Sequence, residues 1–256
     1  MSSSRRPGAG SQRGRGSGSK TTITAPTGRG VTVRVKTAAK RSVSSARWLE
    51  RQLNDPYVIE AQKQGYRSRA AFKLLQLDER FPFLKAGARI VDLGCAPGGW
   101  AQVAAAKVFK AGSAKEGGAK GGKIIGIDLL PVDPIPGAEL IQMDFMAEEA
   151  PETLKRLLDG PADVVLSDMA ASATGHARTD HLKIMALAEA AYEFAAEVLA
   201  PGGTFIAKVL QGGATDTLLA SLKRDFAEVK HVKPPASRAD SAEIYVVALK
   251  FRGNKG

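Results

Sequence analysis

The chain has 256 residues, enough for one α/β domain with an extension. Its single cysteine, Cys95, excludes an internal disulfide and a cysteine-rich zinc site. The three histidines, His176, His181 and His231, form no ligand cluster, so we expect no metal. No apolar run approaches the roughly 18 residues that a membrane span needs, and no apolar stretch follows the first charges. These features favour a cytoplasmic protein without a membrane segment.

The formal net charge of +11 lies entirely in the first fifth of the chain. Residues 1–51 hold 12 Lys and Arg against one acid, whereas residues 52–256 hold 25 of each kind. A segment of Gly, Ser and Arg has little to bury, so we predict a disordered basic tail over residues 1–45 and a folded domain over residues 46–256. Such a tail attracts polyanions without base specificity. The alternative is a tail that only improves solubility.

Predicted elements follow in regular order after the tail. We expect Ser68 to cap a helix over residues 69–81, which Pro82 ends. The apolar pattern then predicts strands at residues 88–93, 123–128, 139–144, 162–168, 204–210 and 243–249. It predicts helices at residues 99–109, 147–158, 180–199 and 215–226. Glycine-rich segments predict a surface loop at 111–122 and a turn at 201–203. Strands that alternate with helices predict a mostly parallel sheet with helices on both faces.

The first of these strands ends in a glycine turn, with the sequence I-V-D-L-G-C-A-P-G-G-W at residues 90–100. Strand, glycine turn and helix bring bare backbone close to a ligand at the carboxyl end of a strand. The spacing is not the G-x-G-x-x-G dinucleotide fingerprint, which argues against a nicotinamide oxidoreductase, and the Gly-Lys-Ser/Thr of a P-loop is missing. The turn therefore favours an adenosine ligand without phosphate, such as S-adenosylmethionine.

Acidic residues end the next three predicted strands. Asp128, Asp144 and Asp168 would line one crevice, because the carboxyl ends of parallel strands meet at one edge of an open α/β sheet. A carboxylate at Asp128 can accept both ribose hydroxyls of an adenosine, and Asp144 with Phe145 suits an adenine amino group and its ring face. Any one of these acids could instead be a helix cap or a turn residue. The series in this order favours a cofactor cleft.

Three further charged residues occur in apolar surroundings or at a strand start. Lys208 lies inside the apolar strand T-F-I-A-K-V-L, and lysine is seldom buried without a partner. Lys73 lies among the apolar residues of the first predicted helix, and Glu243 opens the last strand. The pattern alone leaves open whether these are surface charges, a structural ion pair or part of a site.

Five motifs resemble the FtsJ-type family of ribose 2′-O-methyltransferases. They are Y-R-S-R-A-A-F-K-L (66–74), V-D-L-G-C-A-P-G-G-W (91–100), L-S-D-M-A (166–170), L-A-P-G-G-T-F-I-A-K-V-L-Q-G (199–212) and K-P-P-A-S-R-A-D-S-A-E-I-Y-V-V-A (233–248), in family order with compatible spacing. The resemblance implies the Rossmann-like fold of class I S-adenosylmethionine-dependent methyltransferases, with a mostly parallel seven-stranded sheet. It also implies a catalytic tetrad of Lys73, Asp168, Lys208 and Glu243, and cofactor contacts at Gly98, Trp100, Asp128, Asp144 and Asp168.

The motifs are most similar to bacterial members of the family that methylate a uridine ribose of large-subunit (23S) ribosomal RNA. This implies the same S-adenosylmethionine-dependent reaction, on the assembled 50S subunit, by a monomer. Lys73, Arg67 and Arg69 would contact the RNA. Relatives that modify tRNA or messenger caps are an alternative, and so is a non-catalytic RNA-binding assembly factor on the same scaffold.

The chain departs from the family pattern in three places. The basic tail is longer than the family's usual start, and residues 111–122 look like an insertion in a surface loop, which tolerates added length. The family's D-M-A-P-N reads Asp168-Met-Ala-Ala-Ser172 here. This change removes a proline and an amide near the expected site of the target nucleotide.

Overall fold

The computed structural model describes residues 42–109, 121–171, 175–212 and 216–253. The predicted tail lies almost wholly outside these residues, and so does most of the predicted loop at 111–122. The helices are α1 (Val43–Leu53), α2 (Pro56–Lys63), α3 (Ala70–Arg80), α4 (Gly99–Val108), α5 (Ala150–Leu158), α6 (Ala177–Val198) and α7 (Asp216–Asp225). The strands are β1 (Arg89–Leu93), β2 (Lys123–Asp128), β3 (Ala138–Gln142), β4 (Ala162–Ser167), β5 (Leu199–Leu210), β6 (Phe226–Val232) and β7 (Glu243–Phe251).

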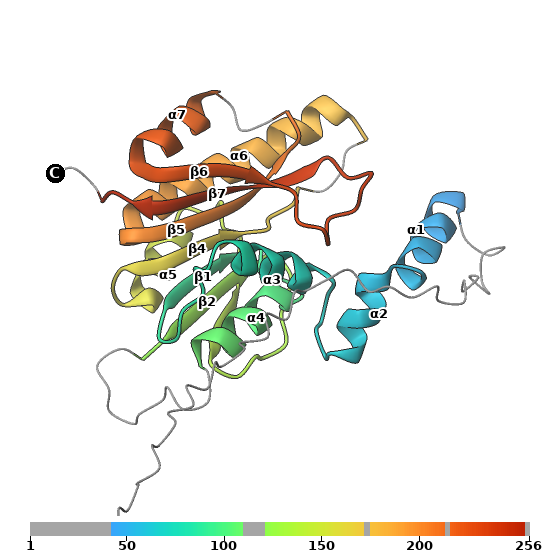
Figure 1. Cartoon of the computed structure of the whole chain (residues 1–256), viewed down its shortest axis with the longest axis horizontal. Coiled ribbons are helices and arrows are strands. Elements are labelled where there is room, and N and C mark those ends of the chain that lie inside the picture. The colour runs from blue at the N-terminus through green and yellow to red at the C-terminus, as the bar shows by residue number, and fades with distance from the viewer. Residues whose placement is uncertain (1–41, 110–120, 172–174, 213–215, 254–256) are drawn as a thin grey trace, which may run out of the picture.

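Seven described strands form one sheet in the order β3-β2-β1-β4-β5-β7-β6. Strands β1 to β5 run parallel, and β7 is inserted antiparallel between β5 and β6. Helices α3 and α4 cover one face and α5, α6 and α7 cover the other, with α2 next to α3 and α1 beyond α2 (Figure 1). The predicted mostly parallel seven-stranded sheet with helices on both faces is confirmed.

Alternating side chains of the central strands supply both layers of the core. In β1, Ile90 packs in the layer of α3 and α4, and Val91 packs in the layer of α5 and α6; both are fully buried. Successive side chains of a strand point to opposite faces, so a strand covered on both sides is apolar throughout. The buried charged residues of these strands, Asp92 in β1 and Lys208 in β5, are therefore exceptions to the apolar pattern. No described helix is long and apolar enough to cross a membrane.

The two helices at the start of the described chain begin with polar caps, and α2 packs on α3 through a small apolar cluster. The Ser42 side chain caps α1, and the Asp55 carboxylate accepts a hydrogen bond from Tyr57 N at the start of α2. Tyr57 packs against Phe72 of α3, with ring centroids 5.4 Å apart. This packing places Asp55 beside α3, where it takes part in the site described below.

Three predicted features differ in the structure. Arg69 occupies the N-cap position of α3. Ser68, predicted as the cap, accepts a hydrogen bond from Ala71 N through its backbone carbonyl and not through its side chain. The predicted turn at 201–203 is part of β5, because Leu199 already pairs with Ala162 and the register shifts before Thr204, as in a bulge. Strand β3 ends at Gln142, so Asp144 lies in the following turn, where its carboxylate accepts from Met146 N at 2.9 Å.

Candidate active site

Four charged side chains from distant parts of the chain meet at the carboxyl end of the parallel strands. The Asp168 carboxylate lies 3.2 Å from Lys208 Nζ and 3.9 Å from Lys73 Nζ. The Glu243 carboxylate lies 3.4 Å from Lys73 Nζ and 3.9 Å from Lys208 Nζ. Each lysine thus faces both carboxylates. We call this group the tetrad.

Strand register explains why these residues meet. Strands β4 and β5 are parallel with Ser167 opposite Ala207, so the next residues, Asp168 and Lys208, lie side by side. Strand β7 returns antiparallel with Glu243 opposite Leu210, two residues beyond Lys208. The fourth member, Lys73, projects from α3, which covers this face of the sheet.

The tetrad is enclosed on one side and open on the other. The Lys208 side chain is 5% exposed, whereas that of Glu243 is 34% exposed, so Glu243 marks the entrance. Burial raises the pKa of Asp168, but the charges of Lys208 and Lys73 and a hydrogen bond from Tyr245 outweigh burial and hold this pKa below its ordinary value. Asp168 is therefore a carboxylate at neutral pH.

Tyr245 belongs to the same cluster and was missed by the sequence analysis. Its fully buried hydroxyl donates a hydrogen bond to Asp168 Oδ1 at 2.7 Å and accepts one from Lys73 Nζ at 3.0 Å. Burial and the neighbouring Asp168 raise the pKa of Tyr245 well above its ordinary value, so it remains a donor. Its position two residues after Glu243, on the same face of β7, was the available signal.

A cavity of about 370 Å³ opens on the far side of Asp168, between the ends of β1, β2 and β3 and helix α6. It is lined by Gly94, Asp128, Asp144 and Phe145, and by Met169, the residue after Asp168. Two backbone groups orient the Asp128 carboxylate: Ala96 N donates to Oδ2 and Leu130 N donates to Oδ1, both at 2.9 Å. The structure thus brings Asp128 and Asp144 together in one mostly apolar cavity.

Of the residues in the glycine turn, Gly94 lines this cavity, whereas the predicted contacts Gly98 and Trp100 do not. Gly94 has a φ of +79°, and a Cβ there would lie 2.8 Å from a side-chain carbon of Met169, so bare backbone is required. Gly98, with a φ of +109°, is the N-cap of α4. The Trp100 indole is buried and donates to Ala70 O at 2.8 Å, so only its backbone remains for a ligand.

Asp92, inside β1, is a second residue that the sequence analysis left without a role. Its side chain is fully buried, and neither carboxylate oxygen has a hydrogen-bond partner among the described residues. Burial, with smaller contributions from Asp168 and Asp128, raises the pKa of Asp92 to about 8. Asp92 is therefore mostly protonated at pH 7.

This raised pKa predicts a pH-dependent cost to stability. Asp92 binds its proton more tightly in the folded chain, so it lowers the free energy of unfolding increasingly as pH rises from its unfolded pKa near 4 to about 8. We expect Asp92→Asn to be more stable than the wild type by a few kcal/mol at pH 8, an order-of-magnitude value, and by little at pH 4. Denaturant unfolding at both pH values checks this; a difference that does not depend on pH would contradict it.

A second cavity, of about 450 Å³, opens on the other side of the tetrad and is called the acceptor groove here. Lys73 and Glu243 line it, together with Arg51, Arg69 and Arg238. The tetrad therefore lies between two cavities, one mostly apolar with acids at strand ends and one rich in arginine.

The buried carboxylate of Asp55 holds two of these arginines in place. It lies 2.7 Å from Arg69 Nη1 and 3.4 Å from Arg238 Nε. Arg69, expected to contact RNA, is thus at the groove. Arg67 does not line the groove. Its guanidinium donates hydrogen bonds to the carbonyls of Asp133 and Pro134 at 2.7 and 2.9 Å, and so holds the loop between β2 and β3.

In the described part of the chain, no group of His, Cys, Asp and Glu could hold a metal ion.

Comparison with known proteins identifies the family. The family model of FtsJ-like methyltransferases matches residues 66–251, which include all five motifs and the whole tetrad. The chain belongs to the FtsJ-like methyltransferase family. The resemblance read from the motifs is thereby confirmed.

Relatives of this FtsJ-like methyltransferase match nearly its full length. A protein of Paramagnetospirillum magneticum named ribosomal RNA large subunit methyltransferase E is 60% identical over 243 residues, which cover 94% of this chain and 98% of the relative. A protein of Parvibaculum lavamentivorans with the same name is 59% identical over 225 residues, 88% of this chain and 89% of the relative. A crystal structure from Plasmodium falciparum, described provisionally as a ribosomal RNA methyltransferase, has a TM-score of 0.62 and 36% identity, and covers 74% of this chain and 100% of that one.

Proposed function

We propose that this chain transfers the methyl group of S-adenosylmethionine to the 2′-hydroxyl of a uridine ribose in large-subunit ribosomal RNA, on the assembled subunit. The observation that carries the proposal is the position of the tetrad between two cavities of different chemistry. One suits an adenosine and the other suits a polyanion. The relatives described above are named ribosomal RNA large subunit methyltransferase E, and their similarity to this chain supports ribosomal RNA as the acceptor.

The residues of the first cavity fit S-adenosylmethionine. The oriented Asp128 carboxylate keeps free lone pairs for two ribose hydroxyls, and Phe145 offers an apolar surface to an adenine. Asp144 would accept from the adenine amino group, and Gly94 and Gly98 would let the backbone approach the rest of the cofactor. Asp168 and the backbone of Trp100 complete the proposed contacts. When bound, the cofactor supplies a methyl group on a positively charged sulfur, which departs as a neutral thioether.

The tetrad would place the acceptor hydroxyl and remove its proton. We assign Lys208 Nζ as the general base: as a neutral amine that has first released its own proton to solvent, it would take the 2′-hydroxyl proton as the oxygen bonds to the methyl carbon and the carbon–sulfur bond breaks. Asp168 fixes Lys208 from one side, through its carboxylate at 3.2 Å and its carbonyl oxygen at 2.9 Å. Holding the hydroxyl in line with the methyl group supplies a large share of the rate, on the order of 7–11 kcal/mol for well-oriented reactants.

The acceptor groove would bind the RNA around the target ribose. Lys73 and Glu243 lie at its inner end, so the ribose would enter past them. Arg238, which is held by Asp55 through Nε, would contact a phosphate beside the target nucleotide, and Arg69, whose guanidinium binds Asp55 and the Ala236 carbonyl, would add positive charge to the groove. Arginine suits this role because its planar group donates two parallel hydrogen bonds to a phosphate.

Methyl transfer from labelled S-adenosylmethionine tests this proposal. The purified chain would be incubated separately with large ribosomal subunits, protein-free ribosomal RNA and tRNA, and the labelled nucleotide identified after digestion. We expect a 2′-O-methyluridine from the large subunit. Labelling of a base, or of tRNA alone, would refute the proposal.

The basic tail, which lies outside the described residues, should add salt-dependent affinity for RNA. Residues 1–40 contain nine Lys and Arg and no acid. Each phosphate contact contributes about 0.7–0.9 to the slope of log affinity against log salt. Deleting residues 1–40 should weaken RNA binding and flatten this slope without changing the dissociation constant for S-adenosylmethionine. Titrations at several salt concentrations check this, and an unchanged slope would show that the tail does not contact RNA.

A further inference from the structure

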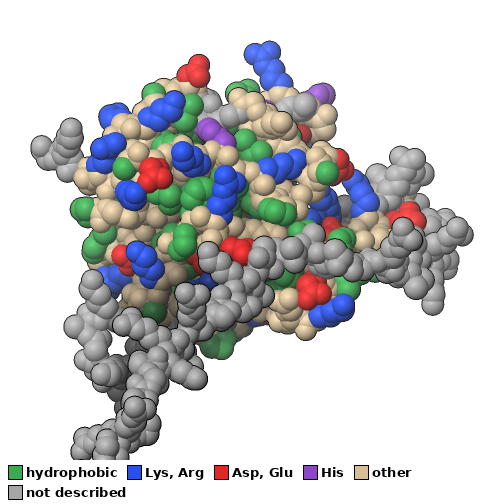
Figure 2. Space-filling model, viewed as in Figure 1, with side chains coloured by type: hydrophobic (Ala, Val, Ile, Leu, Met, Phe, Trp, Pro, Cys, Tyr) green, Lys and Arg blue, Asp and Glu red, His purple; other side chains and the backbone are tan. Residues whose placement is uncertain are grey.

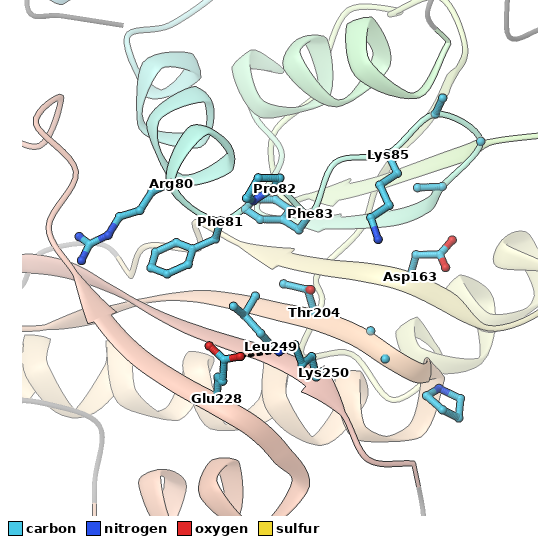
Figure 3. A pocket seen from close by; sticks show the side chains of 16 residues that line it. Arg80, Phe81, Pro82, Phe83, Lys85, Asp163, Thr204, Glu228, Leu249 and Lys250 are labelled. Atoms are coloured by element: carbon cyan, nitrogen blue, oxygen red, sulfur yellow. Dashed lines mark hydrogen bonds and ion pairs between the residues drawn. The ribbon is translucent and has the colours of Figure 1, made fainter. Parts of the chain in front are cut away.

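A larger cavity, of about 660 Å³, lies at the opposite end of the sheet from the tetrad (Figure 3). The end of α3 and the loop after it form one wall, and strands β5, β6 and β7 form the other. The proposed methyl transfer makes no use of this cavity.

The cavity and the tetrad share one face of the sheet. Thr204 lines the cavity and Lys208 belongs to the tetrad, and these two residues of β5 are four positions apart and point to the same side. At about 3.3 Å per residue they are separated by about 13 Å. Helix α3 links the same two places, with Lys73 near its first turn and Arg80 as its last residue. Buried Ile206 and helix α3 lie between the two places, so an RNA strand that reaches the tetrad would run over the outer surface of α3 to this cavity.

An aromatic ring and two cations without a carboxylate partner among the described residues line the cavity. The Arg80 guanidinium lies 5.2 Å from the centroid of the half-buried Phe81 ring. Figure 3 shows the Lys85 side chain reaching into the cavity from the wall that also carries Phe81. Arg80 and Lys85 are exposed, and neither has a carboxylate partner in the described part of the chain. On the face shown in Figure 2, Lys and Arg side chains are interspersed with apolar ones.

The two acids of the cavity already have partners. The Glu228 carboxylate lies 2.6 Å from Lys250 Nζ, and Asp163 Oδ2 accepts a hydrogen bond from Arg89 N at 2.8 Å. Their charge is therefore partly satisfied, and the positive charges of Arg80 and Lys85 remain for a ligand. The cavity favours an anion with an aromatic part.

The backbone of β7 is bent at this cavity. Lys250 has a φ of +61°, in the left-handed region that residues other than glycine rarely adopt. In a regular strand Leu249 and Lys250 would point to opposite faces, yet both line the cavity. The unusual backbone thus brings Lys250 to the cavity, where it holds Glu228.

We propose that this cavity is a second RNA-binding site, which takes an unstacked nucleotide of the RNA whose ribose is methylated at the tetrad. The base stacks on Phe81, and the adjacent phosphates bind Arg80 and Lys85. An aromatic ring flanked by cations is a common means of holding single-stranded nucleic acid. The inference rests on the proposed function, because that function makes RNA the substrate.

Binding to protein-free large-subunit ribosomal RNA tests the site. The variant is Arg80→Gln with Lys85→Gln, and the matched control is Arg156→Gln with Lys223→Gln, which removes the same charges from exposed positions on α5 and α7, over the other face. We expect the first variant to bind on the order of tenfold more weakly near 0.1 M salt, with a salt slope reduced by about 1.4, the value for two phosphate contacts to a single strand. Its dissociation constant for S-adenosylmethionine should equal that of the control.

Affinity and salt slope equal to those of the control would overturn the proposal. So would a loss of affinity for ribosomal subunits without a loss for protein-free RNA, since it would identify a protein contact. Failure of the proposed function is distinguishable, because in that case the wild type itself would not methylate ribosomal RNA.

Ultraviolet cross-linking locates the contact independently of the variants. Trypsin cuts after Arg80 and Lys85, so the cavity wall is released as the single peptide Phe81–Lys85. Wild-type chain irradiated with bound ribosomal RNA should yield this peptide with a nucleotide attached. Cross-links confined to the acceptor groove, with none on Phe81–Lys85, would contradict a second site.

Discussion

Replacing Lys208 with methionine is expected to slow methyl transfer by about 10²–10⁴-fold, the usual contribution of a general base. Methionine has similar length but cannot accept the proton. The Lys208 amine is the least exposed of the tetrad side chains and lies between two carboxylates, which hold it in place. Single-turnover methylation with saturating cofactor and RNA measures the chemical step.

Lys208→Arg separates a base from a fixed positive charge. Arginine keeps the charge and the hydrogen bonds but is not deprotonated in proteins. If Lys208 removes the proton, the arginine variant should be as slow as the methionine variant. A near-normal rate for Lys208→Arg would contradict the base and leave only an electrostatic role. Thermal unfolding of each variant verifies that the fold is intact.

Asp168→Asn should have the second large effect, a loss of methyl transfer on the order of 10²–10³-fold. The amide keeps the shape but removes the charge that holds Lys73, Lys208 and the Tyr245 hydroxyl in position. The variant should also be less stable. Lys73 and Lys208 are nearly buried, and Glu243 would be the one carboxylate left to both of them within the described site. Single-turnover methylation and denaturant unfolding measure the two losses.

The stability loss should have a defined pH dependence. The pKa of Asp168 is lowered in the folded chain, so its stabilising contribution is complete above its unfolded pKa near 4 and disappears as pH falls through the lower folded value. The difference between wild type and Asp168→Asn should therefore be constant from pH 6 to 8 and shrink only below pH 4. As a comparison, Tyr245→Phe removes one hydrogen bond to Asp168 without changing its charge, and should lose much less activity than Asp168→Asn. Equal losses for both variants would show that the charge is not the main contribution.

Local pattern was enough to predict six of the seven described strands and helices α3 to α7, but not α1, α2 or β6. Strands such as residues 88–93 are buried on both faces, so each can be recognised from its own apolar run and flanking glycines without knowledge of distant contacts. Boundaries set by tertiary pairing were missed. The start of β5 at Leu199 depends on its pairing with Ala162, and the position of Asp144 depends on where the ladder between β2 and β3 ends.

The candidate site was predicted mainly through the resemblance to a family. Pattern alone marked Lys208 as unusual but could not show that it meets Glu243, because antiparallel insertion of β7 next to β5 is not visible in the sequence. Tyr245 looked like an ordinary strand residue, and Asp92 lay inside the predicted strand at residues 88–93 without an assigned role. Their roles depend on burial and on neighbours that only the folded chain supplies.

The most direct measurement is a map of ribose methylation across ribosomal RNA from cells with and without the gene for this chain. We expect that one 2′-O-methyluridine of the large subunit is absent without the gene, and that the wild-type gene restores it whereas a Lys208→Met gene does not. An identical map in both cells, or full restoration by Lys208→Met, would contradict methyl transfer to RNA at this tetrad.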